Sequence, residues 1–81
     1  MDRDALVALF RSTGGDGWRQ RDNWDTTAKK LARWFGVKMN DQGRVVELRL
    51  AVNNLQGAIP AQLAALNELT RLHLSNNQLI G

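Results

Sequence analysis

Cysteine is absent from this sequence of 81 residues, and so is any long apolar run. Without cysteine the chain cannot form a disulfide, a thiolate metal site or a cysteine nucleophile. No stretch approaches the roughly 20 apolar residues of a membrane-spanning helix, and no charged-then-apolar signal segment opens the chain. We therefore expect no membrane partner. The localisation stays open: the missing cysteine favours a reducing, cytoplasmic compartment but is also compatible with secretion.

The sequence offers few residues for catalysis or metal binding. His73 is the only histidine, and no acid–base partner lies near it in the sequence. Asp22, Asn23 and Asp25 are close together but lack the central glycine and the terminal glutamate of a calcium loop. We therefore expect a protein that is not an enzyme and that has no cofactor and no bound metal.

Charge is unevenly distributed along the chain. Residues 1–44 carry nine Lys and Arg against six Asp, a net charge of +3, whereas residues 45–81 carry two Arg against two Glu and are neutral. A nucleic-acid interface needs basic residues gathered on one face, and here acids interrupt them throughout. A second possible basis for nucleic-acid binding is the stacking of bases on Trp18, Trp24 and Trp34, which have arginines beside them in the sequence. We favour a different role, in which the three indoles seal the end of an apolar core.

The most informative feature is a pattern that recurs after 24 residues. The first copy reads Val45-x-x-Leu48-x-Leu50-x-x-Asn53-x-Leu55-x-Gly57-x-Ile59-Pro60-x-x-Leu63-x-x-Leu66, and the second contains Leu69, Leu72, Leu74, Asn77, Leu79 and Gly81. A fixed period in the twenties is typical of a solenoid, whose repeats bury a core by stacking on neighbours. We expect a cap over residues 1–44, a first repeat over 45–68 and an incomplete second repeat over 69–81. The function would then belong to a larger protein or assembly.

The cap is predicted to be mainly helical with a short β-hairpin. Apolar residues at helical spacing, among them Leu6 and Leu9, predict a first helix that Asp2 caps and that Gly14-Gly15 ends. An ordered loop follows, and Asp25 or Thr26 is expected to begin a second short helix through about residue 33. Residues 37–39 and 45–50 alternate as strands around a turn at 40–43.

Each repeat carries an asparagine where its chain leaves the strand, Asn53 in the first and Asn77 in the second. An asparagine side chain has two donors and an acceptor, so it can satisfy backbone groups that the bend frees. We expect the stacked asparagines to form a ladder with a structural role.

The repeat pattern LxxLxLxxNxLxGxIPxxLxxL resembles the 24-residue, plant-type leucine-rich repeat. The preceding segment is similar to the N-terminal cap of such proteins through Ala5-Leu6-x-x-Leu9-Phe10, Trp34-x-Gly36-Val37 and Gly43-Arg44-Val45. Its Ser12-to-Trp18 stretch and Asn23-Trp24 resemble caps of algal and bacterial members. Ala32 and Met39 stand where secreted plant caps usually carry a cysteine pair, which argues against an extracellular location. The resemblance implies an α/β solenoid that continues as a right-handed superhelix.

In this family the repeat strands form a parallel sheet on a concave face, and residues between the core leucines point outward. We therefore expect a ligand face for a protein or peptide, with Glu47 beside Arg71 and Arg49 beside His73. All of its strand residues should be exposed, and the core leucines should face inward. The complete expected face consists of Glu47, Arg49, Ala51, Arg71, His73 and Ser75.

The incomplete second repeat is expected to leave an open apolar edge. An unpaired strand edge is a template for pairing with another chain, so we expect self-association into a homo-oligomer there. The residues of this edge are Leu69, Leu72, Leu74 and Leu79.

Three functions remain compatible with the sequence. The first is a non-catalytic protein-interaction module, the capped N-terminal end of a recognition array. The second is the recognition arm of a multidomain signalling enzyme, a kinase or a GTPase, whose catalytic part lies elsewhere. The third, which we favour least, is nucleic-acid binding by the basic cap.

Overall fold

A computed structural model describes residues 2–24 and 30–80. Residues 2–24 and 30–44 contain the helix α1 (Asp2–Ser12), two 3₁₀ turns and the strand β1, and residues 45–80 contain the other strands and one 3₁₀ helix. In chain order the elements after α1 are η1 (Gly15–Gly17), η2 (Leu31–Arg33), β1 (Val37–Met39), β2 (Val45–Arg49), β3 (Gln56–Ala58), η3 (Ala61–Ala65), β4 (Arg71–His73) and β5 (Gln78–Ile80).

The predicted elements are present with two qualifications. Where the second short helix is expected, the described residues form the 3₁₀ turn η2, and its expected start at Asp25 or Thr26 lies outside the described residues. The first helix begins at Asp2 and ends before Gly14, whose φ of +66° is the left-handed conformation that glycine adopts readily. The hairpin and the 3₁₀ helix of the first repeat lie where the sequence predicts them.

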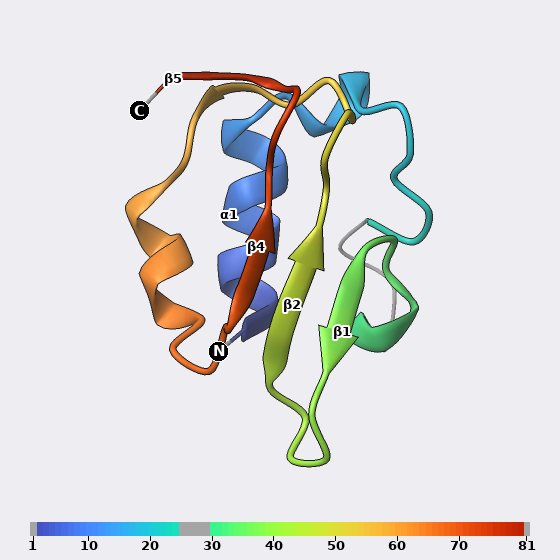
Figure 1. The fold of residues 1–81 in the computed structure, drawn as a ribbon, viewed down its shortest axis with the longest axis vertical. Helices are drawn as coiled ribbons and strands as arrows, with labels where there is room; N and C mark the ends of the chain where they lie inside the picture. Colours follow the sequence, from blue (N-terminus) through green and yellow to red (C-terminus); the bar gives the residue numbers. More distant parts are fainter. Residues whose placement is uncertain (1, 25–29, 81) are drawn as a thin grey trace.

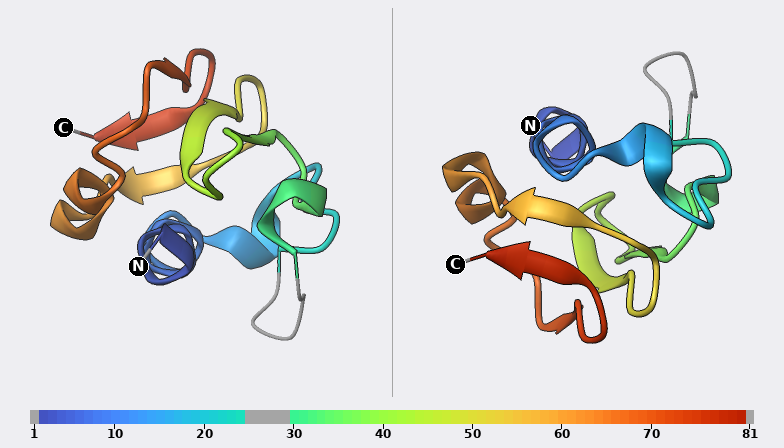
Figure 2. Two further views of the ribbon diagram at one scale, coloured as in Figure 1. Left: turned by 90° about the horizontal axis from the view of Figure 1, so that it is seen from below. Right: turned by 90° about the horizontal axis from the view of Figure 1, so that it is seen from above.

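The strands form two small sheets around one core. In the first, β2 lies between β1, to which it is antiparallel, and β4, to which it is parallel. In the second, β3 and β5 pair in parallel at one end of the molecule. The helices α1 and η3 lie side by side behind the three-stranded sheet (Figure 1, Figure 2). The fully buried side chains between these layers include Leu6, Leu9, Val45, Leu48, Leu50 and Leu55.

The C-terminal end of α1 docks directly on the first repeat. Ser12 Oγ donates a hydrogen bond to the Ala58 carbonyl at 2.7 Å, and the Gln56 N–H donates to the Thr13 carbonyl at 3.0 Å. Gly57 has a φ of +92°, and a Cβ at this position would lie 2.8 Å from the Ser12 carbonyl oxygen. The glycine of the repeat pattern is therefore required both by its backbone conformation and by the close approach of the helix.

The expected asparagine ladder is present. Asn77 Oδ1 accepts hydrogen bonds from the backbone N–H groups of Asn53 at 2.8 Å and Leu55 at 3.0 Å, and its Nδ2 donates to the Leu50 carbonyl at 2.8 Å. Asn53 makes the corresponding bonds to the cap, because its Nδ2 donates to the Gln20 carbonyl and its Oδ1 accepts from the Gln20 N–H. The backbone at Gln20 thus bonds to Asn53 much as the backbone of residues 50–55 bonds to Asn77.

The expected capping role of Asp2 is replaced by a different one. Its carboxylate accepts hydrogen bonds from the Arg44 side chain and from the backbone N–H of Val45. Arg44 also donates to Asn67 Oδ1 at 2.9 Å. The pair therefore ties the start of α1 to the hairpin and to the segment that follows η3, a long-range contact that helix-capping rules do not anticipate.

Candidate functional site

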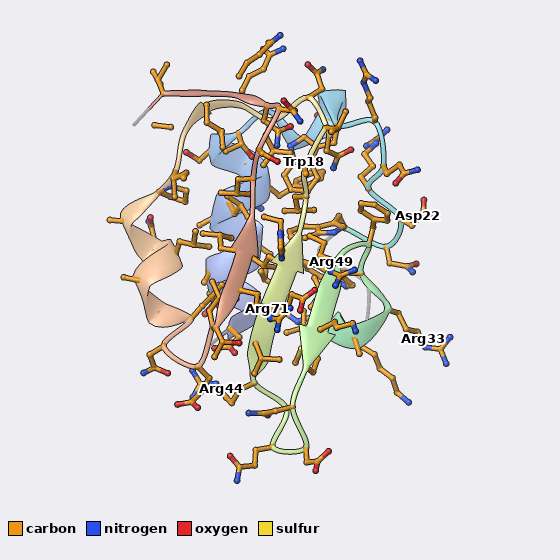
Figure 3. The ribbon with its side chains drawn as sticks, in the orientation of Figure 1. Trp18, Asp22, Arg33, Arg44, Arg49 and Arg71 are labelled. Atoms are coloured by element: carbon orange, nitrogen blue, oxygen red, sulfur yellow. The ribbon has the colours of Figure 1, made fainter. Side chains whose placement is uncertain are left out.

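The outer face of the three-stranded sheet brings together most of the expected ligand face. Residues of β2 and β4 are in register, with Glu47 opposite Arg71 and Arg49 opposite His73, as predicted. On the other side of β2, Lys38 of β1 lies opposite Glu47. Figure 3 shows Arg49 and Arg71 in front of the sheet, on the face turned away from α1. We call Lys38, Glu47, Arg49, Arg71 and His73 the sheet face.

The expected exposure of Glu47 is wrong. The residue is only 7% exposed, although its side chain points to the same face as the exposed Arg49. It lies on the central strand, where the long side chains of Lys38 and Arg71 flank it in register, and Arg49 Nε donates to its carboxylate. Neighbouring side chains, rather than the protein core, cover this carboxylate.

Neighbouring basic side chains favour the ionised form of the Glu47 carboxyl. Burial by itself raises the pKa of the Glu47 carboxyl, but the hydrogen bond from Arg49 and the positive charges of Arg49, Lys38 and Arg71 outweigh it, so the pKa lies below its ordinary value. The carboxylate is therefore ionised at neutral pH. With three basic side chains around one carboxylate, the sheet face has a net charge of +2 when His73 is neutral.

The other expected residues of the ligand face lie at its surface. Arg49, Arg71 and His73 are exposed, as predicted. Ala51 and Ser75 are also exposed, but they lie beyond the ends of β2 and β4, where the chain turns. They border the sheet face without belonging to a strand.

The sequence prediction missed Lys38 as part of this face. The signal was available, because Lys38 alternates with Val37 and Met39 and so points to the side opposite the core. What the sequence did not supply was the register of the hairpin, which places Lys38 directly beside Glu47. A residue of the hairpin strand β1 thus contributes to a face otherwise built by β2 and β4.

The tryptophans seal the core, as favoured from the sequence. The alternative, in which they form a platform for base stacking, is wrong. Trp18, Trp24 and Trp34 are 4%, 3% and 2% exposed. Their rings contact one another and Phe10, with centroids 4.8 Å apart between Trp18 and Trp24 and 5.0 Å apart between Trp24 and Trp34. The favoured alternative to base stacking is therefore confirmed, because buried indoles present no open ring face to a nucleic-acid base.

The second repeat presents the expected apolar edge. Within the described sheet, β4 is an edge strand, and its Leu72 is 43% exposed. Leu69, Leu74 and Leu79 are half-buried and pack against the core, while Ile80 of β5 is 69% exposed. Part of this apolar edge is therefore already packed against the core of the chain itself.

Two absences hold for residues 2–24 and 30–80, the part of the chain that the structure describes. None of their His, Asp and Glu side chains gather into a group that could hold a metal ion. None of their helices is long and apolar enough to cross a membrane.

No protein-family model matches the sequence. The chain is 33% identical to a probable leucine-rich repeat receptor-like protein kinase of Arabidopsis thaliana, over 70% of this chain and 7% of that protein. It is 39% identical to leucine-rich repeat protein 1 of the same organism, over 88% of this chain and 32% of that protein. The chain therefore spans a small part of each of these relatives.

Solved structures superpose on the fold of this chain. A leucine-rich repeat protein from Bacteroides eggerthii superposes with a TM-score of 0.77 at 30% identity, over 88% of this chain and 12% of that one. The PEPR1–AtPEP1 complex superposes with a TM-score of 0.72 over 96% of this chain and 11% of that one. Its identity of 21% supports the fold alone.

Proposed function

The chain is a leucine-rich repeat protein with a solenoid fold, and we propose that it is the capped N-terminal end of a non-catalytic recognition array. In this proposal residues 1–44 shield the first repeat, and residues 45–68 and 69–81 begin a right-handed superhelix. The sheet face supplies the part of the ligand surface nearest the cap.

The observation that carries this proposal is the cluster of charges on the sheet face. Lys38, Arg49 and Arg71 surround one ionised carboxylate, and a surface of net positive charge attracts an oppositely charged partner. We infer that the ligand is an acidic segment of a protein or peptide. Two repeats offer less than the roughly 800 Å² per partner of a standard interface, so the affinity of this chain alone should be low.

Mapping by NMR tests the location of the site. Titration with a decaglutamate peptide should shift the backbone amide signals of Lys38, Arg49, Arg71 and His73. The hairpin turn at Asp41 lies beyond the sheet face and serves as an internal control, because its signal should not move. Shifts that spread evenly over the surface, or that gather on α1, would overturn the assignment of the ligand to the sheet face.

The relatives suggest a second proposal at the level of the whole protein. Two Arabidopsis relatives bear names of leucine-rich repeat receptor-like kinases, but the chain spans only 7% and 6% of them. We propose, as the alternative, that the array is the recognition arm of a multidomain signalling enzyme. The reading frame of the parent protein distinguishes the two, because the alternative requires a kinase or GTPase domain in it.

We also propose that residues 1–81 on their own self-associate through the edge of the second repeat, which a following repeat of the array would otherwise cover. Leu72 and Ile80 are exposed there, and β4 has unpaired backbone groups on its outer side within the described sheet. A dimer about a twofold axis would cover the same edge of both copies. Leu69, Leu74 and Leu79 lie along this edge and would be buried further.

A further inference from the structure

Three exposed side chains of the sheet face form a triangle of hydrogen-bond donors. Arg49 and His73 lie opposite each other on β2 and β4, about 4.8 Å apart in the backbone. Arg71 lies two residues before His73 on the same side of β4, about 6.6 Å along the strand. Figure 3 shows both arginine side chains in front of this face. We call Arg49, Arg71 and His73 the donor triangle.

Most donors of the triangle have no acceptor within the protein. Arg49 Nε donates to the Glu47 carboxylate, which fixes the guanidinium and leaves the N–H groups of both Nη atoms for a ligand. The Arg71 side chain interacts with Glu47 through its charge and, like the His73 imidazole, forms no hydrogen bond with residues 2–24 and 30–80. An imidazole carries an N–H donor in either protonation state. The triangle can therefore offer donors from three side chains to one anion.

A phosphate monoester fits this triangle better than a carboxylate does. At neutral pH a phosphorylated side chain has a charge of about −1.5 to −2 and three acceptor oxygens, whereas a carboxylate has a single charge and two oxygens. Arginine binds phosphate through paired hydrogen bonds, and arginine clusters commonly recognise phosphorylated segments. The sheet face has a net charge of +2 when His73 is neutral, so a phosphate dianion balances it.

Lys38 belongs to the sheet face but not to the triangle. The register across the sheet runs from Lys38 through Glu47 to Arg71, so about 9.6 Å of backbone spacing separates Lys38 from Arg71. The ionised carboxylate of Glu47 lies between them and repels a phosphate from that position. Lys38 is therefore placed to contact a second acidic group of the same ligand.

We propose that the donor triangle binds a phosphorylated serine or threonine within the acidic ligand segment. The phosphate oxygens accept hydrogen bonds from Arg49, Arg71 and His73, and a flanking acidic residue of the ligand lies near Lys38. The inference rests on the proposed function, because it requires the acidic segment to bind the sheet face. It adds the chemical class of one ligand residue and gives His73 a role as a donor.

Peptides that differ only at their centre test this site by NMR titration. They have the sequence Ala-Glu-Ala-X-Ala-Glu-Ala, where X is phosphoserine or a pair of glutamates that matches the charge of the phosphate. The phosphoserine peptide should bind about tenfold more tightly than the peptide of equal charge, because one phosphate engages three side chains at once. Its ³¹P signal and the amide signals of the donor triangle should report the same dissociation constant. Inorganic phosphate lacks the flanking acids and should bind more weakly than the phosphoserine peptide.

Matched variants separate the triangle from the general charge of the face. Arg71→Gln and Lys38→Gln each remove one exposed positive charge that flanks Glu47, and amide spectra like that of the wild type establish that both are folded. Arg71→Gln should abolish the preference for phosphoserine, because it breaks the triangle. Lys38→Gln should weaken both peptides by a similar factor and keep the preference. His73→Ala should reduce the preference severalfold.

The outcomes distinguish this inference from the proposed function. If both peptides shift the sheet-face signals but bind equally well, the phosphate inference is overturned and the proposed function stands. The same conclusion follows if Lys38→Gln abolishes the preference as Arg71→Gln does, or if inorganic phosphate binds as tightly as the phosphoserine peptide. If neither peptide shifts these signals, both the inference and the proposed function are overturned.

Discussion

The carboxylate of Asp2 and the guanidinium of Arg44, 42 residues apart, form a paired contact in which Nε donates to Oδ2 at 3.1 Å and Nη2 donates to Oδ1 at 3.0 Å. Side by side, two such bonds fix the orientation of both groups. Asp2 lies in the first turn of α1, and Arg44 follows the hairpin turn and also donates to Asn67 Oδ1. The pair therefore fixes the start of α1 to the hairpin and to the segment after η3, at the end opposite the asparagine ladder.

The Asp2 pair makes stability depend on pH. The hydrogen bond from Arg44 lowers the pKa of Asp2 below its ordinary value of 3.8, against the opposing effect of burial. Its stabilisation is therefore present above about pH 4 and is lost as the pH falls through the lowered pKa. Asp2→Asn should reduce the free energy of unfolding at pH 7 by about 1 kcal/mol. Urea denaturation from pH 7 to pH 2 should show this difference shrinking below pH 4.

Asp4→Asn is the matched control for this experiment, because Asp4 lies in the same turn of α1 and is exposed. It should change the free energy of unfolding by less than about 0.5 kcal/mol at any pH. An Asp2→Asn difference that stays constant down to pH 2 would show that the pair does not contribute through the charge of Asp2.

Trp34 should be essential for the cap. It is 2% exposed, packs against Trp24 and lies beneath the guanidinium of Arg3, 5.4 Å from its ring. Trp34→Ala should lower the free energy of unfolding by roughly 3–5 kcal/mol in chemical denaturation, because it leaves a large cavity. Trp34→Phe keeps much of the ring volume and should cost distinctly less. A loss under about 1 kcal/mol for the alanine variant would contradict the packing role of Trp34.

Val52 should be a site where substitution stabilises the protein. It has a φ of +53°, which is strained for a β-branched residue, and its equivalent 24 residues later is Asn76, with a φ of +57°. Asparagine adopts this conformation more readily, so Val52→Asn should raise the free energy of unfolding by about 1 kcal/mol. The reciprocal change, Asn76→Val, should lower it by a similar amount. If both variants had the wild-type stability, the left-handed backbone at these positions would carry no cost.

The open edge should make the chain associate at high concentration. Sedimentation equilibrium over a hundredfold concentration range should detect dimers, since apolar area at roughly 25 cal/mol per Å² favours burial before association costs are subtracted. Leu72→Lys places a charge on β4 and should shift the equilibrium to the monomer, whereas Val52→Lys, on an exposed turn, should not. A wild-type chain that stays monomeric throughout would contradict self-association through this edge.

The repeats could be predicted from the sequence because their features are local and periodic. The 24-residue period gave the strand register, so the positions of Arg49 beside His73 and of Asn77 on the preceding repeat followed from spacing alone. Alternation within one strand also placed Arg49 outward. A pattern with a fixed period predicts both the direction in which a side chain points and the residue that lies beside it on the next repeat.

The errors arose where long side chains or distant segments meet. Alternation gave the direction of Glu47 but not its burial, which depends on Lys38 and Arg71 from two other strands. Asp2 matched a helix cap by position, yet its carboxylate binds Arg44, and no local rule anticipates that partner.

A change of ligand preference on charge reversal tests the central proposal, that the sheet face binds an acidic ligand. Wild-type protein should bind decaglutamate in preference to decalysine, whereas the double variant Arg49→Glu, Arg71→Glu should prefer decalysine. Both substitutions place a carboxylate beside the buried Glu47, so chemical denaturation should first establish that the double variant is folded. The double variant Arg19→Glu, Arg33→Glu alters the net charge equally outside the sheet face and should keep the acidic preference. Isothermal titration calorimetry with the two peptides measures all three proteins; a sheet-face variant that still prefers decaglutamate, or a control that loses the preference equally, would contradict the account.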